Sequence, residues 1–73
     1  MKVYGKKVLS DKPALLEEVV LQVGAAEARV LASFLIECAE EMESEDLWEH
    51  RHFSDWDGKN EEHGNCDLIV FRL

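Results

Sequence analysis

The stretch AAEARVLASFLIECAEEME, residues 25–43, decides the fold of this 73-residue chain. Its apolar side chains recur at intervals of three and four, the period of an amphipathic helix: Ala28, Leu31, Phe34, Leu35, Cys38 and Met42. Glu27 stands in the first turn, where the helix dipole favours an acid. The pattern predicts a helix from Ala25 to about Glu43, with one apolar face and one acidic outer face that includes Glu37 and Glu40.

Two strands are expected before this helix. Residues 17–23, EEVVLQV, are rich in β-formers and end at Gly24, which predicts a strand. Residues 2–9 alternate weakly among lysines, as edge strands do, and residues 10–13 form a turn. An alternative for the second segment is a helix, because Leu15, Leu16, Val19, Val20 and Val23 also fit a helical stripe behind Pro13.

Two further strands are expected after the helix. Residues 47–56, LWEHRHFSDW, would place Arg51 and Phe53 on one face and Trp48, His50, His52 and Trp56 on the other. Residues 57–65 form a polar loop with turn residues. Residues 66–73, CDLIVFRL, are apolar on both faces, which is typical of a central strand.

The resulting order is ββαββ, an α+β fold in one domain spanning residues 1–73. We expect a four-stranded, mainly antiparallel sheet with the helix packed on one face. The spatial order 1-2-4-3 would place the two most apolar strands in the centre, whereas 2-1-4-3, as in ubiquitin-like grasp folds, is the alternative. Either order leaves an apolar sheet face uncovered, which predicts a homodimer through that face or another partner on it.

The charge of the chain limits its partners. Sixteen acidic and eight basic residues give a net charge of −8. Phosphate and anionic lipid contacts need clusters of Lys and Arg, so we expect no nucleic acid and no membrane partner. If charge selects a partner, it selects a basic protein, and the alternative is that the acidic charge only keeps the domain soluble. Two cysteines, and no signal-peptide pattern or apolar run of about 20 residues, predict a cytoplasmic protein with reduced thiols.

His50 and His52 form the most distinctive polar motif. On a strand, side chains two residues apart point the same way, about 6.5–7 Å apart. Two such imidazoles can share a metal ion, with His63 in the following loop as a third ligand. The alternative is that the histidines pack and hydrogen-bond beside Trp48 and Trp56. We expect no dedicated cofactor and keep the metal site as a hypothesis.

Catalysis finds little support in the sequence. It contains no glycine-rich phosphate loop, nucleophile elbow or zinc-protease motif. Cys38 has a core position on the helix, where a thiol is inert. Cys66 has no evident oxyanion site or substrate pocket beside it. We therefore predict that the chain is not an enzyme and acts by binding.

Several segments together suggest a family. Four stretches resemble small bacterial proteins of the immunity protein 32 family: EEVVLQV (residues 17–23), LASFLIECAEEME (31–43), WEHRHFSD (48–55) and CDLIVF (66–71). The resemblance implies a cytoplasmic, non-enzymatic protein that blocks a toxin. An acidic helix face would suit a basic toxin surface. We expect the partner-binding residues to include Trp48, Trp56, Glu37, Glu40 and Glu41.

Overall fold

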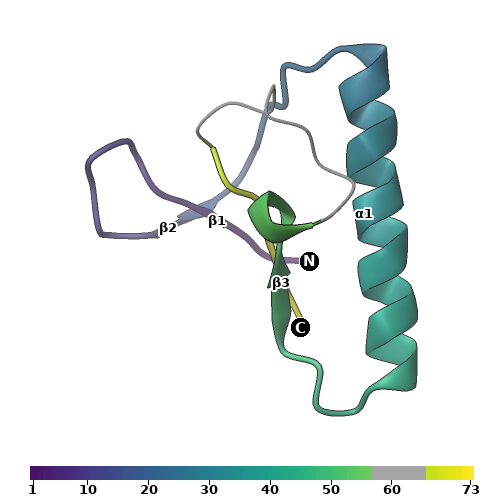
Figure 1. Ribbon diagram of the computed structural model, residues 1–73. Helices are drawn as coiled ribbons and strands as arrows, with labels where there is room; N and C mark the ends of the chain where they lie inside the picture. Colours follow the sequence, from purple (N-terminus) through teal and green to yellow (C-terminus); the bar gives the residue numbers. More distant parts are fainter. Residues whose placement is uncertain (57–65) are drawn as a thin grey trace.

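The computed structural model describes residues 1–56 and 66–73. The described elements are β1 (Val3–Gly5), β2 (Ala14–Leu16), α1 (Ala25–Ser44), β3 (His50–His52), a 3-10 turn η1 (Phe53–Asp55) and β4 (Ile69–Phe71). The predicted α+β class and the ββαββ order are confirmed (Figure 1). None of the described helices has the length and apolarity needed to cross a membrane.

Helix α1 matches its prediction to within one residue. It begins after Gly24 and ends where the backbone N–H of Glu45 donates to the carbonyl of Glu41 at 2.9 Å. Its inner face carries the fully buried Phe34 and Cys38. Leu35, which the periodicity also assigned to the inner stripe, is 45% exposed, because it lies at the margin of the surface that the helix can cover.

The core lies between α1 and the β3–β4 hairpin. Phe34 and Cys38 of the helix pack with Trp48 and Phe53, which flank β3. The rings of Phe34 and Phe53 lie 5.1 Å apart at a tilted angle of 55°, a favourable aromatic geometry. Half-buried side chains complete this core: Val30, Leu31, Met42, Trp56, Leu68 and Val70. We call residues 25–56 and 66–73 the body.

The expected four-stranded sheet is wrong, because the strands form two separate antiparallel pairs. β1 pairs with β2 and β3 pairs with β4, so neither 1-2-4-3 nor 2-1-4-3 describes the molecule. The predicted strand over 17–23 is also wrong, since β2 ends at Leu16 and residues 17–24 run on without strand pairing. The β1–β2 pair therefore never reaches β4, which pairs on one side only.

The two faces of the β3–β4 hairpin differ. Arg51 bonds to α1, and its cross-strand neighbour Val70 packs against the core. His50, His52, Ile69 and Phe71 alternate with them and lie on the face turned away from α1, which we call the open face.

The tryptophans break the expected alternation. Trp48 lies before β3, in a turn that is closed by a hydrogen bond from the backbone N–H of Trp48 to the carbonyl of Glu45 at 3.1 Å. Trp56 follows η1, whose tight turn replaces the second half of the predicted strand. Both indoles consequently reach the helix side, although the alternation of a continuous strand placed them with the histidines.

The β1–β2 hairpin stands apart from the body. Residues 1–16, which we call the arm, lie on the side of β3 opposite α1 (Figure 1). The strands are joined through a turn in which Ser10 N–H donates to the Lys7 carbonyl at 3.0 Å and Leu9 has a φ of 66°. The radius of gyration is 13.0 Å, against about 11 Å for a compact domain of this length.

Candidate functional site

A polar network joins α1 to the β3–β4 hairpin. Arg51 Nη1 donates to Glu37 Oε1 at 3.1 Å and to Glu41 Oε2 at 2.5 Å. The indole N–H of Trp56 donates to Glu37 Oε2 at 2.6 Å, and that of Trp48 donates to Glu41 Oε1 at 2.8 Å. The hydrogen bonds from Trp56 and then Arg51 hold the pKa of Glu37 below its ordinary value. One cation and two indoles thus satisfy two half-buried carboxylates.

This network contains four of the five residues predicted to bind a partner. Glu37 and Glu41 point toward the hairpin, because positions 34, 37, 38 and 41 share one side of a helix. Among the five, Glu40 is exposed on the outside of α1. The network therefore gives Trp48, Trp56, Glu37 and Glu41 a role in the packing of the hairpin. Their role in partner binding stays a prediction.

Exposed acids gather at the carboxyl end of α1 and in the loop that follows. We call this surface the acidic end, and it consists of Glu40, Glu43, Glu45, Asp46 and Glu49. The last turn of the helix reads Glu41-Met42-Glu43-Ser44, so acids stand where the helix dipole is itself negative. Arg72 borders the surface and donates to the carbonyls of Met42 and Glu45.

The open face places the two histidines together, as the strand spacing predicted. The ring centroids of His50 and His52 lie 5.4 Å apart, and the ring of His50 stacks on Phe71 at 4.6 Å. His52 Nδ1 lies 2.7 Å from Asp67 Oδ2, and Ser54 N–H donates to Asp67 Oδ1 at 3.1 Å. Burial works to raise the pKa of Asp67, but these hydrogen bonds outweigh it and lower the pKa.

The structure leaves the metal hypothesis as a prediction. His50 and His52 share a face, but within residues 1–56 and 66–73 there is no group of three or more His, Cys, Asp or Glu side chains arranged to hold a metal. The third predicted ligand, His63, lies outside the described residues. Asp67 is the polar partner that sequence reasoning missed, although its place two residues before β4, just beyond the end of β3, could have suggested it.

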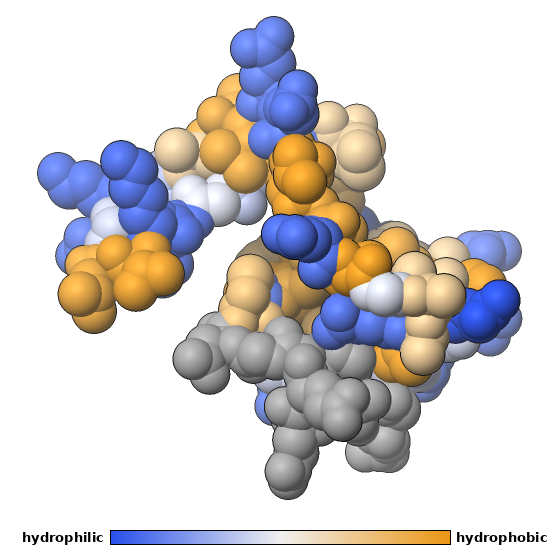
Figure 2. Space-filling model, turned by 90° about the horizontal axis from the view of Figure 1, so that it is seen from above, coloured by the Kyte–Doolittle hydropathy of each residue, from blue (hydrophilic) through white to orange (hydrophobic). Residues whose placement is uncertain are grey.

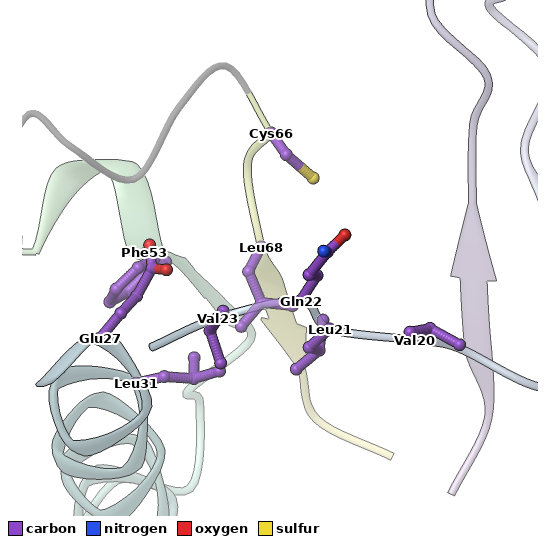
Figure 3. A pocket seen from close by; sticks show the side chains of 9 residues that line it. All are labelled: Val20, Leu21, Gln22, Val23, Glu27, Leu31, Phe53, Cys66 and Leu68. Atoms are coloured by element: carbon purple, nitrogen blue, oxygen red, sulfur yellow. The ribbon is translucent and has the colours of Figure 1, made fainter. Parts of the chain in front are cut away.

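A hollow of about 280 Å³ opens between the body and residues 20–23 (Figure 3). Figure 3 shows Val23, Leu31 and Leu68 directed toward one another, with Glu27 beside Phe53. Cys66 is exposed at the rim, whereas Cys38 is buried and burial raises the pKa of its thiol. The lining is mostly apolar, so this hollow offers packing surface rather than an array of reactive groups.

Comparison with known proteins gives one match. Residues 18–73 match the family model described as immunity protein 32. No curated protein matches the chain, and no solved structure does. The matched range includes α1, the β3–β4 hairpin, the acidic end and the open face, whereas the arm precedes it.

Proposed function

The chain belongs to the immunity protein 32 family, and from this membership we propose that it is a non-enzymatic protein that neutralises a toxin by binding it. The proposal places the protein in the cytoplasm of the cell that it protects. Binding energy would come from one exposed surface of the body. The surface best suited to this role is the acidic end, and its partner is a basic surface on the toxin.

The observation that carries this assignment is the position of the acids relative to the helix dipole. Negative side chains near the carboxyl end of a helix each cost roughly 0.3–1 kcal/mol in unfavourable interaction with the dipole. Glu43 and Glu45 stand at that end, the last turn itself holds no basic residue, and Arg72 is the cation that donates to its carbonyls from another part of the chain. A charge arrangement that opposes folding supports a role outside folding, because local rules are commonly broken at functional sites.

Charge also suits the required mechanism. A protective protein has to reach its target quickly, and complementary charge raises association rates while excluding wrong partners. Glu40, Glu43 and Glu49 are all exposed and carry no described ion pair to a lysine or arginine, so they can meet a cationic surface. Arg72 at the border fixes the local backbone through the carbonyls of Met42 and Glu45.

Co-expression with toxin domains encoded beside this gene tests the proposal. The wild-type chain should restore growth of cells that express the cognate toxin domain. The double variant Glu40→Lys/Glu43→Lys should lose this protection and weaken binding to the purified toxin domain by about tenfold or more. Calorimetry gives the dissociation constants.

The matched control is Glu17→Lys/Glu18→Lys, which changes the net charge equally on exposed residues outside the acidic end. This variant should still protect the cells. Equal weakening by both double variants would mean that net charge alone matters, and would remove the acidic end as the binding surface. Failure of the wild-type chain to bind any neighbouring toxin domain would refute the proposed function itself.

A further inference from the structure

Several large apolar side chains of the described residues remain exposed, and exposed apolar patches on small proteins mark interaction sites. They form two groups, one on the arm (Tyr4, Val8, Leu9 and Leu15) and one on the open face (Ile69 and Phe71). This surplus of apolar surface is available for contact with a second copy.

Much of this surplus lies on the arm. Val8 and Leu9 at its turn are 91% and 103% exposed, and Tyr4 and Leu15 of the strands are exposed as well. Figure 2 shows the arm as a lobe on the left that combines hydrophobic and hydrophilic residues and stands off from the rest of the molecule. An isolated two-stranded hairpin is marginally stable in water. The arm would therefore be stabilised by another surface that covers its apolar side chains.

Charge identifies the surface that the arm fits. Residues 1–16 contain four lysines and one aspartate, a charge of +3. The body, residues 25–56 and 66–73, contains three basic and ten acidic residues, a charge of −7. A basic toxin surface would repel this arm, whereas the body of a second copy attracts it.

The open face is the part of the body that offers apolar area to the arm. Phe71 is 61% exposed and Ile69 is 42% exposed, although both belong to a strand. The arm lies on the same side of the hairpin as this face but leaves it exposed within its own chain.

We propose that two copies of this chain form a homodimer in which the basic arm of each protomer packs on the open face of the other. In this reciprocal arrangement the apolar side chains of the arm cover Ile69 and Phe71, and its lysines lie near the acidic body. The contact is separate from the acidic end that is proposed to bind the toxin, so dimerisation and protection are tested independently.

Light scattering during size-exclusion chromatography measures the mass of the full-length chain across micromolar concentrations. The wild type should run as a dimer, and its dissociation constant should rise with sodium chloride, since salt screens the lysine–carboxylate attraction. Phe71→Asp should raise that constant by about 10- to 100-fold. A wild-type chain that remains monomeric throughout this micromolar concentration range would overturn the proposal.

The matched control is Ile36→Asp, because Ile36 is 60% exposed on the outside of α1 while Phe71 is 61% exposed on the open face. This control should stay dimeric. If it dissociates as readily as Phe71→Asp, the contact lies on the helix and the proposed interface is wrong. Circular dichroism should show the same helix content for both variants, since neither residue is buried.

Mixing distinguishes an arm-to-face contact from a face-to-face contact. The variant Lys6→Glu/Lys7→Glu has a damaged arm and an intact open face, whereas Phe71→Asp has the reverse. A mixture of the two should contain a heterodimer held by one intact arm on one intact face, at concentrations where each variant alone is monomeric. Restoration also shows that both variants are folded. If the mixture stays monomeric, the reciprocal arm exchange is excluded.

Discussion

The body and the arm each contain an antiparallel hairpin of three-residue strands, but they differ in what covers them. β3 and β4 pack against α1 through Phe53, Val70 and the Arg51 network. β1 and β2 pair with each other at the same strand length, yet none of their side chains is fully buried, and Tyr4 and Leu15 are exposed. Strand pairing is therefore local, whereas burial depends on a surface brought from elsewhere in the chain or from another molecule.

The largest expected effect comes from removing the centre of the core. Phe34 is fully buried and contacts both Phe53 and Trp56, so Phe34→Ala should destabilise the fold by about 3–5 kcal/mol. A domain of this size has a total stability of only about 4–11 kcal/mol. Urea unfolding followed by tryptophan fluorescence measures the change.

The corresponding truncation in the arm is Leu15→Ala, a residue that is exposed. It should change the free energy of unfolding by less than about 0.5 kcal/mol in dilute, monomeric protein. Comparable losses from Phe34→Ala and Leu15→Ala would show that the arm packs against the body, and the distinction between the two regions would fail.

The next effect tests the polar part of the body. Arg51→Met leaves Glu37 and Glu41 without their shared cation, so the melting temperature should fall, but only by a few degrees because solvent screens these partly exposed ion pairs. The matched control is Arg29→Met, because Arg29 is exposed on α1. It should change the free energy of unfolding by less than about 0.5 kcal/mol. Thermal unfolding compares them, and equal melting temperatures would show that the network contributes no stability.

The sequence predicts the helix well because its signal is local and strong. Apolar spacing over five turns specified Phe34 and Cys38 as core, and strand alternation placed His50 and His52 on one face together. The sheet could not be predicted in the same way. Whether β2 pairs with β4 depends on distant contacts, and a mostly apolar run such as residues 20–23 can line a hollow as readily as it forms a strand.

The orientation of the acidic residues shows a second limit of sequence reasoning. A helical wheel with an acidic outer face treats every glutamate as a solvated charge. Glu37 and Glu41 instead accept hydrogen bonds from Trp56 and Trp48, because the turns on either side of β3 bring those indoles to the helix. These hydrogen-bonded pairs depend on the backbone geometry of the two turns. The amino-acid sequence of the turns does not predict that geometry.

Acid should weaken the body in a narrow pH range. The folded pKa values of Asp67 and Glu37 lie below the ordinary values of 3.8 and 4.5. Their contribution to stability is therefore complete above these ordinary values and is lost as the pH falls through the lower folded pKa values. Melting temperatures between about pH 5 and pH 2 should show the loss.

The variant Asp67→Asn tests the share of this effect that comes from Asp67. It should be less stable than the wild type at neutral pH and should lose less stability on acidification. A pH profile identical to that of the wild type would contradict the His52–Asp67 interaction.

The smallest expected effect concerns the arm alone. Leu9 adopts a φ of 66°, a left-handed conformation that costs a branched residue roughly 1–2 kcal/mol and a glycine almost nothing. Since the Leu9 side chain is fully exposed, Leu9→Gly removes no packing within the chain and should favour the turn between Lys7 and Ser10. Amide hydrogen exchange should therefore slow in β1 and β2 while α1, β3 and β4 keep their rates, because the two regions share few contacts. Slower exchange in the body as well would mean that the arm and the body unfold together, and the independence of the two hairpins would then have to be abandoned.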